Sequence, residues 1–186
     1  MSKIFDGNDA FDWTKTFAEQ VLTPGQAAAT IENGDSLACS LPEPTGFLYA
    51  LAKRTELRDI TIFIPAPRRG GVAIAKHPGI ELRTPFLTQI MRDAGAHAEV
   101  VPVRLEDWGS FTKRNASRIS IVQVGKPRPD GSVPPGSAIA GNDALVRKNR
   151  QKSDLVFALV NPVVPDVPGD SFHVSDFDGL IEIPLE

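Results

Sequence analysis

Residues 36–54 read SLACSLPEPTGFLYALAKR, and three signals follow one another in this stretch in the order typical of α/β proteins. An apolar run at 36–40 predicts a buried strand, a loop holds a glutamate between two prolines, and residues 45–55 have a helical pattern. Ligands of α/β proteins bind at such strand-end loops. Glu43 is therefore either a carboxylate beside a ligand site or an acidic residue near the first turn of the next helix, where the helix dipole favours negative charge.

Strand and helix patterns alternate on both sides of this stretch. Upstream, Thr23 as N-cap and Pro24 at the first helical position predict a short helix over 24–33 that stops at Gly34. Downstream we expect strands at 60–66, 97–103, 118–124 and 153–160, helices at 84–95, 105–114 and 138–152, and a Pro- and Gly-rich loop at 125–137. Because the strands are apolar on both faces, the sequence predicts an α/β fold with a mostly parallel, doubly wound sheet flanked by helices.

The size and composition of the chain narrow its class. Its 186 residues are enough for one large domain, and we expect a polar lead-in over 1–22 followed by one α/β domain over 23–186. With 20 Lys and Arg against 23 Asp and Glu, no general basic surface for nucleic acid is expected. A single cysteine, Cys39, excludes an internal disulfide framework and reads as a small buried apolar residue. No stretch approaches the roughly 20 apolar residues of a membrane span, so we expect a soluble cytoplasmic protein without a membrane partner.

Standard motifs for cofactors and metals are largely missing from the sequence. The segment RRGGVA at 68–73 has two glycines, but their spacing is not that of a dinucleotide fingerprint. The three histidines lie far apart in the sequence. Asp176 and Asp178 could form a metal-binding pair, although an Asp-rich turn that caps backbone amides is commoner. We therefore expect no metal site and no permanently bound cofactor.

Two further groups of polar residues each allow two interpretations. Asn161 follows the strand at 153–160 and could aim its amide into a ligand crevice or hold the turn into Pro162, and we favour the crevice. A locally basic loop could meet the phosphates or carboxylate of a ligand, although solvated surface charge is the commoner role. Its cations are Arg68, Arg69, Lys76 and Arg83.

Three segments of the sequence resemble a known family: NGDSLACSLPEPTGFLYAL (33–51), HAEVVPVRLEDWGSF (97–111) and the run from VGKPRPDG to FDGLIE (124–182). In order and spacing they resemble the N-terminal half of the acetyl-CoA hydrolase/transferase family, which includes the 4-hydroxybutyrate and propionate CoA-transferases. Most of residues 24–182 lines up almost without gaps. The resemblance implies a domain of the CoA-transferase type.

The resemblance also implies an activity and partners. Members of this family act through a glutamate that attacks the acyl-CoA thioester and carries the CoA to a second carboxylate. That glutamate belongs to the C-terminal half of the family, which this chain does not contain, so we assign no catalytic residue and Glu43 is not the nucleophile. The implied substrates are acyl-CoA or coenzyme A and a small carboxylic acid. The implied partner is a C-terminal CoA-transferase domain or subunit, in an oligomer.

Departures from the family pattern lie in the loops. Pro42 replaces the glycine of Gly-Glu-Pro-Thr, and the family Ser-Pro-Pro-Asp reads Gly-Lys-Pro-Arg at 125–128. Pro134 replaces the serine of Ser-Leu-Gly, and Asp166 replaces an arginine. These changes fit a relative with a different substrate. They also fit an alternative, a non-catalytic binding or assembly module that kept the fold.

The loops at 40–46, 125–136 and 161–170 all follow strands, so in a parallel sheet they gather at one edge. We expect a substrate crevice there, and an ammonium at position 126, where the family has an apolar proline, would favour a dicarboxylic acid. Alternatively, the side chain of Lys126 swings into solvent. The expected lining is Ser40, Leu41, Pro42, Glu43, Gly125, Lys126 and Asn161.

Overall fold

A parallel eight-stranded sheet forms the centre of the protein. The structure is a computed structural model that describes residues 11–104, 107, 117–136, 143–148, 155–166 and 169–183. Within these residues the strand order is β1-β10-β8-β6-β2-β3-β4-β5, and each neighbouring pair is parallel. The strands are β1 (Val21–Leu22), β2 (Ser36–Cys39), β3 (Ile60–Phe63), β4 (Ile80–Thr84), β5 (Glu99–Val100), β6 (Ile119–Val124), β8 (Leu155–Val160) and β10 (Gly179–Glu182). An antiparallel pair, β7 (Ser132–Val133) and β9 (Phe172–His173), lies outside this sheet.

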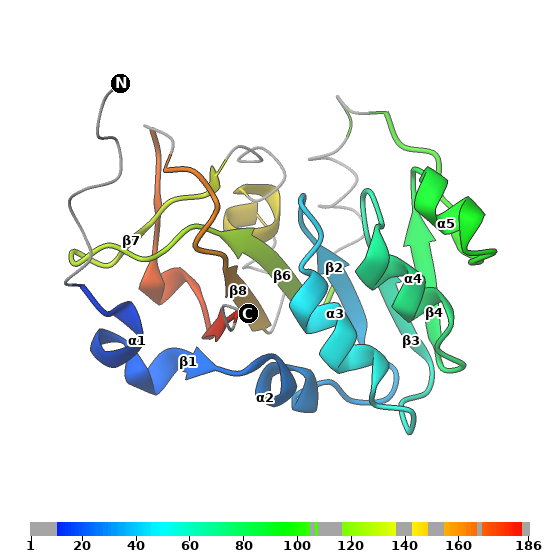
Figure 1. The fold of residues 1–186 in the computed structure, drawn as a ribbon, viewed down its shortest axis with the longest axis horizontal. Helices are drawn as coiled ribbons and strands as arrows, with labels where there is room; N and C mark the ends of the chain where they lie inside the picture. Colours follow the sequence, from blue (N-terminus) through cyan, green and yellow to red (C-terminus); the bar gives the residue numbers. More distant parts are fainter. Residues whose placement is uncertain are drawn as a thin grey trace.

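The sheet is doubly wound, as predicted. From β2 the chain proceeds outward through β3, β4 and β5, then returns to β6 on the other side of β2 and continues through β8 to β10. Figure 1 shows α2, α3 and α4 side by side along one face of the sheet. The helices are α1 (Trp13–Thr16), α2 (Pro24–Ala29), α3 (Thr45–Ala52), α4 (Arg69–Ala75) and α5 (Gln89–Asp93), with short turns η1 (Ala18–Gln20), η4 (Ala144–Lys148) and η5 (Val174–Asp176).

Alternating side chains of the central strands fill two cores, one on each face. Phe157 and Leu159 of β8 belong to the cluster under α2, α3, α4 and α5. Their neighbours Val156, Ala158 and Val160 belong to the opposite cluster, which includes residues of α1, η4 and η5. Because successive residues of a strand point to opposite faces, this division explains why β8 is apolar at every position.

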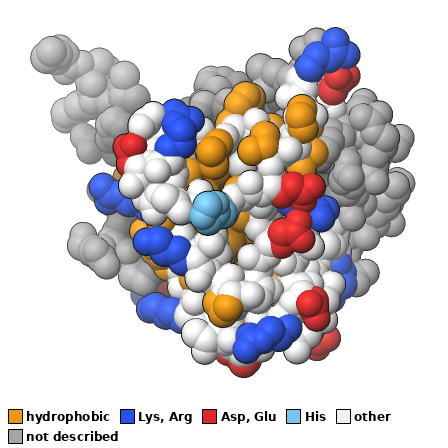
Figure 2. Space-filling model, turned by 90° about the vertical axis from the view of Figure 1, so that its right-hand side faces the viewer, with side chains coloured by type: hydrophobic (Ala, Val, Ile, Leu, Met, Phe, Trp, Pro, Cys, Tyr) orange, Lys and Arg blue, Asp and Glu red, His pale blue; other side chains and the backbone are white. Residues whose placement is uncertain are grey.

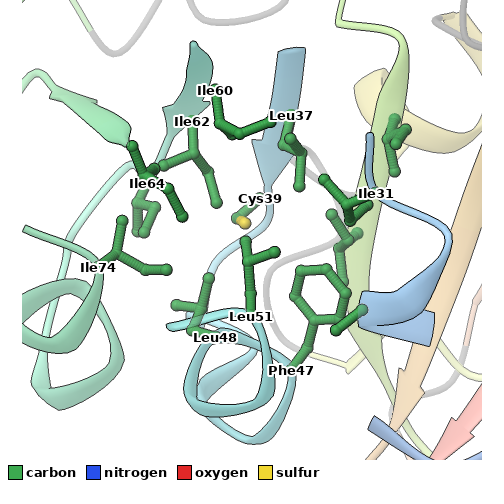
Figure 3. Packing of buried hydrophobic residues seen from close by; sticks show 14 of the residues in the cluster. Ile31, Leu37, Cys39, Phe47, Leu48, Leu51, Ile60, Ile62, Ile64 and Ile74 are labelled. Atoms are coloured by element: carbon green, nitrogen blue, oxygen red, sulfur yellow. The ribbon is translucent and has the colours of Figure 1, made fainter. Parts of the chain in front are cut away.

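Cys39 lies in the core between β2 and the helices, as expected for a small apolar residue. Figure 3 shows its sulfur beside Leu48, Leu51 and Ile62. Burial, with a further contribution from the nearby charge of Glu43, raises the pKa of the thiol well above its usual range. The side chain therefore stays a neutral thiol and is no nucleophile.

Local sequence signals identified the start of α2 correctly. Thr23 accepts a hydrogen bond from the Gln26 amide at 3.2 Å, and the Gln26 side chain accepts one from the Thr23 amide at 2.8 Å. The two bonds form a capping box. The helix ends at Ala29, before Gly34, which has a φ of +86°.

Residues 68–83 differ from the prediction. We predicted only a basic loop there, but the segment contains α4 and most of β4. Arg69 begins α4, Lys76 is its C-cap, and Arg83 lies in β4, where it pairs with Glu81 at 3.0 Å and Glu99 at 2.7 Å. Two glycines within α4 weaken the helical pattern, since glycine has a poor helix propensity.

Other predicted elements are shorter than expected. The helix expected at 84–95 is only α5, because Thr84 still belongs to β4, and the strand expected at 97–103 is only β5. Of the helix expected at 138–152, the described residues show the π-helical turn η4. The helix expected at 105–114 lies outside the described residues apart from position 107.

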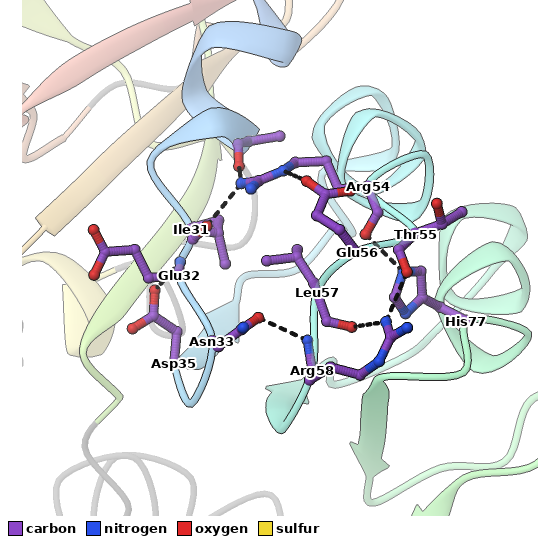
Figure 4. A network of polar contacts seen from close by, with 11 residues as sticks. Ile31, Glu32, Asn33, Asp35, Arg54, Thr55, Glu56, Leu57, Arg58 and His77 are labelled. Carbon is purple, nitrogen blue, oxygen red and sulfur yellow. Dashed lines mark hydrogen bonds and ion pairs between the residues drawn. The ribbon is translucent and has the colours of Figure 1, made fainter.

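At the amino edge of the sheet, opposite the predicted crevice, hydrogen bonds of Arg54 and His77 hold the loops together. Arg54 donates from Nη1 to the carbonyl oxygens of Ala28 and Ile31, both at 2.7 Å, and its own carbonyl lies 3.0 Å from Nε2 of His77 (Figure 4). Nδ1 of His77 accepts from the Gly79 amide at 3.1 Å. These contacts join the loops before β2, β3 and β4, so this edge is a structural one.

A partly buried ion pair joins the starts of β2 and β6 at the same edge. Arg118 donates to both carboxylate oxygens of Asp35 at 2.6 and 2.5 Å. Burial by itself raises the pKa of Asp35, but the hydrogen bonds from Arg118 and from the Glu32 amide outweigh it, and the pKa is lowered. Asp35 is therefore a charged structural residue.

In the part of the chain that the structure describes, none of the helices has the length and apolar character needed to cross a membrane.

Candidate functional site

The carboxyl edge of the sheet brings the predicted loops together at its topological switch point. β2 is paired with β6, and β6 with β8, all in parallel, so the residues that follow these strands are neighbours. The Ser40 amide donates to the Ile121 carbonyl at 2.9 Å, and the Asn161 amide donates to the Val124 carbonyl at 2.9 Å. Open α/β sheets bind ligands at this position.

Two pockets open at this edge, so the single crevice that we expected is divided. The first, of about 420 Å³ and here called the Glu43 pocket, is lined by Leu41, Pro42, Glu43, Ala66, Arg68, Thr88 and Ile90. The second, of about 530 Å³ and here called the Lys126 pocket, is lined by Phe11, Asp12, Trp13, Thr14, Lys126, Val160, Pro162, Glu182 and Ile183. Three of the predicted residues thus share one pocket, while Lys126 belongs to the other.

Ser40 and Gly125 are buried inside the loops, and neither residue lines one of these two pockets. Ser40 is buried, and its hydroxyl accepts from the Gln123 amide at 2.9 Å and donates to the Pro42 carbonyl at 3.4 Å. Gly125 is also buried, and a Cβ at this position would lie 2.7 Å from Cγ of Pro134. Glycine is therefore required for the close approach of the two loop arms.

Glu43 is the most constrained residue of the site, with only 4% of its surface exposed. Its Oε1 accepts from the Gly70 amide at 2.7 Å and the Thr45 hydroxyl at 3.1 Å. Its Oε2 accepts from the Arg68 amide at 2.7 Å and the Gly71 amide at 3.1 Å. The carboxylate therefore stabilises the amino end of α4, a role that neither of our two interpretations of Glu43 had named.

The two glycines of RRGGVA make room for this carboxylate. A Cβ on Gly70 would lie 3.0 Å from Oε1 of Glu43 and 2.8 Å from Cδ1 of Leu48. A Cβ on Gly71 would lie 2.3 Å from Cβ of Pro67. The two glycines are therefore needed because larger residues would collide with neighbouring side chains. In the sequence, the signal for this arrangement is a glycine pair that follows the strand after a glutamate-containing loop.

Arg68, which we had weighed as a ligand contact against solvated surface charge, lines the Glu43 pocket. It is exposed, and among the described residues it makes no ion pair. On the same wall, Thr88 uses its hydroxyl to donate to the Pro67 carbonyl at 2.6 Å. Arg68 is therefore the positively charged group that this pocket presents.

Asn161 holds the turn after β8. Its Oδ1 accepts from the Val163 amide at 3.1 Å, and its main-chain carbonyl accepts from the Val164 amide at 3.1 Å. This is the turn into Pro162 that we had weighed against a ligand contact. Asn161 lies at this edge of the sheet, but it lines neither the Glu43 pocket nor the Lys126 pocket.

Two of the loop departures are partners in one ion pair. Arg128 donates from Nε to Asp166 at 3.2 Å and pairs with it through Nη2, and its Nη1 donates to the hydroxyl of Ser132 at 2.9 Å. The family pattern has aspartate at the first position and arginine at the second. In this chain the ion pair ties the loops after β6 and β8 together, with the arginine on the first loop and the aspartate on the second.

The Asp-rich turn near the C-terminus caps backbone amides. Asp176 accepts from the His173 amide at 2.8 Å, and Asp178 accepts from the Val156 amide at 2.8 Å. Within the described residues no three His, Cys, Asp or Glu side chains are grouped so that they could hold a metal ion.

Comparison of the sequence with family models gives no match, and no curated protein matches it either. Solved structures do match. RipA from Yersinia pestis superposes with a TM-score of 0.79 at 19% identity, over 94% of this chain and 44% of its own. A 4-hydroxybutyrate CoA-transferase from Porphyromonas gingivalis superposes with a TM-score of 0.62 at 18% identity, over 92% of this chain and 41% of its own.

A third structure is closer to this chain in length. A cysteine-to-serine variant of the decarboxylase AibA/AibB superposes with a TM-score of 0.59 at 12% identity, over 88% of this chain and 82% of that chain. At these identities the likeness establishes the fold alone. The chain has a CoA-transferase-like α/β fold and spans less than half the length of RipA and of the 4-hydroxybutyrate CoA-transferase.

Proposed function

We propose that this chain is the N-terminal half or a subunit of an acyl-CoA:carboxylate CoA-transferase or acyl-CoA hydrolase, acting in the cytoplasm. It forms the acyl-side wall of a cleft that it shares with a C-terminal CoA-transferase domain. The observation that carries the proposal is the carboxyl edge, where two pockets of ligand size open and one of them is lined by a glutamate whose carboxylate accepts four hydrogen bonds. Such an edge can bind a substrate, and the Glu43 carboxylate, which accepts four hydrogen bonds, is not free to attack a thioester.

The proposed division of labour follows from this geometry. The partner brings the nucleophilic glutamate and most contacts to coenzyme A, while this chain holds the acyl group or the acceptor acid. Coenzyme A is a substrate in this scheme and not a resident cofactor. In the Lys126 pocket, the exposed ammonium would favour an acid with a second carboxylate, against the opposing charges of Asp12 and Glu182 in the same lining.

An apolar surface supports the need for a partner. Figure 2 shows apolar side chains gathered on the end of the molecule where α5, β4 and β5 lie. Phe86 is 53% exposed, Val100 is 50% exposed and Ile90, which also lines the Glu43 pocket, is 36% exposed. Exposed apolar patches mark interaction surfaces.

The alternative is a binding or assembly module that kept the fold without the chemistry. Pro42 and Pro134 favour it, because each removes a backbone donor from a loop at the site. The ion pair of Arg128 and Asp166 favours the enzyme subunit, because it links two site loops.

The test is to express the chain with and without the protein encoded directly downstream and to measure CoA transfer from acetyl-CoA to short carboxylic acids, and acetyl-CoA hydrolysis. We expect no turnover by the chain alone and turnover by the pair. A stable complex without either activity would favour the assembly module, and turnover by the chain alone would refute the half-enzyme.

A further inference from the structure

The amino edge of the sheet contains the only Asn-Gly pair of the sequence, Asn33 and Gly34, in the turn before β2. Both residues are exposed, and Gly34 has a φ of +86°. We propose that Asn33 is a deamidation site, and that the main chain of Arg58 suppresses the reaction in the folded protein. The reaction involves none of the residues that line the pockets of the carboxyl edge.

The reaction is a ring closure between Asn33 and Gly34. The main-chain nitrogen of Gly34 loses its proton and attacks Cγ of Asn33, and the side-chain nitrogen of Asn33 takes up a proton and leaves as ammonia. Water then opens the resulting succinimide at one of its two carbonyl groups, which leaves either aspartate or isoaspartate at position 33. Glycine hinders the attack least, because it has no Cβ beside the attacking nitrogen. Water is the only co-reactant, and it reaches both exposed residues.

Two hydrogen bonds with the main chain of Arg58, here called the Arg58 clasp, hold the reacting groups. The Arg58 amide donates to Oδ1 of Asn33 at 2.8 Å (Figure 4). The Arg58 carbonyl accepts from the Gly34 amide at 3.2 Å. The first bond fixes the orientation of the side-chain amide, and the second engages the proton that the Gly34 nitrogen must lose. The ring can therefore close only after the clasp opens.

The guanidinium of Arg58 stabilises the turn that carries the clasp. Its Nη1 donates to the carbonyl oxygens of Thr55 and Leu57, both at 2.7 Å (Figure 4). The clasp lies between two surface turns, and such turns open locally at a lower cost than global unfolding. The rate of deamidation in the folded chain is then the rate in the open chain multiplied by the fraction of molecules in which the clasp is open.

The modification would weaken the amino edge of the sheet. Isoaspartate adds a methylene group to the main chain and a negative charge between Glu32 and Asp35. The Glu32 amide donates to Asp35 at 2.8 Å, and Asp35 pairs with Arg118. A longer main chain in this turn displaces those contacts, so the modified chain should be less stable than the unmodified one.

The test is to incubate the chain at mildly alkaline pH, either folded in buffer or unfolded in guanidinium chloride. Mass spectrometry then follows the tryptic peptide of residues 16–53, in which Asn33 is the only asparagine. We expect deamidation to be at least about 10-fold faster in the unfolded chain. In Arg58→Ala the folded chain should deamidate at least about 3-fold faster than the folded wild type, and the unfolded chain at the wild-type rate.

Lys53→Ala is the matched control, because Lys53 is also exposed and basic and lies near Arg58 in the sequence but outside the clasp. Its folded rate should stay within about 2-fold of the wild type. Equal rates in the folded and unfolded wild type would overturn the protection by the fold, and this comparison needs no variant. A faster reaction in the folded chain would also overturn it, and would show that the Arg58 amide stabilises the oxyanion formed on Oδ1. Equal acceleration in both variants would show that the effect is one of charge and not of the clasp.

Discussion

Replacing Glu43 by alanine should destabilise the chain strongly, because three backbone amides of the α4 turn lose their acceptor. Those of Gly70 and Gly71 lie in buried residues, and an unsatisfied buried donor costs about 1–3 kcal/mol. Removing the carboxylate also removes its own desolvation cost, which offsets part of the loss. We therefore expect the free energy of unfolding to fall by about 3 kcal/mol.

Two conservative variants grade this effect. Glu43→Gln keeps one acceptor oxygen but turns an NH₂ group toward amide donors, so we expect a loss of about 1–2 kcal/mol. Thr45→Val removes the hydroxyl donor to Oε1 and leaves the three amide contacts, so we expect a loss of about 1 kcal/mol. The predicted order of stability is wild type, Thr45→Val, Glu43→Gln and Glu43→Ala.

The measurement is urea denaturation at neutral pH followed by far-ultraviolet circular dichroism, with the slope of the transition checked for two-state behaviour. Glu43→Ala within about 0.5 kcal/mol of the wild type would show that the carboxylate does not hold α4. A glutamine variant as stable as the wild type, beside a destabilised alanine variant, would show that the cost arises from lost side-chain volume and not from the lost carboxylate.

The remaining predictions concern other charged groups. Arg128→Asp and Asp166→Arg should each lower the free energy of unfolding by about 0.5–1 kcal/mol, and the double variant, which has the charge order of the family pattern, should recover most of the loss. Urea denaturation of the wild type and the three variants measures these differences. Additive losses in the double variant would contradict the prediction. The pKa of Asp35 is lowered in the fold from 3.8, so its stabilising contribution is present above about pH 4 and is lost as the pH falls below that value. Asp35→Asn should therefore lose less stability than the wild type between about pH 5 and pH 3. Equal changes of unfolding free energy with pH in the two proteins would contradict the pairing with Arg118. Lys126→Pro should lower kcat/KM for dicarboxylic relative to monocarboxylic acceptors in the two-part enzyme, and an unchanged ratio would show that Lys126 does not contact the substrate.

The parallel sheet and the start of α2 could be predicted because their signals are local. The Thr23 capping box is complete within four residues, and runs of apolar residues identify strands that are buried on both faces. The parallel order then places the loops after β2, β6 and β8 at one edge, so the positions of Ser40 and Asn161 followed from topology.

Only the tertiary structure decided what the residues at this edge do. Helix α4 was missed because its amino end is held by Glu43, which lies 25 residues before Arg68 in the sequence, and because its glycines look unfavourable until that carboxylate is placed against them. The single predicted crevice became two pockets because Lys126 faces β8 and β10 while Leu41, Pro42 and Glu43 face the loops after β3 and β4.

The sequence by itself determined the fold class, because hydrophobic periodicity and capping act between residues that are near neighbours in the chain. It did not determine the role of a charged side chain, because that role depends on which distant donors or acceptors reach it. Glu43 as the cap of α4, Arg68 in the pocket wall and Arg128 with Asp166 are all pairings across loops. The free energy of a buried charge is set by those contacts, and only the folded chain brings them together.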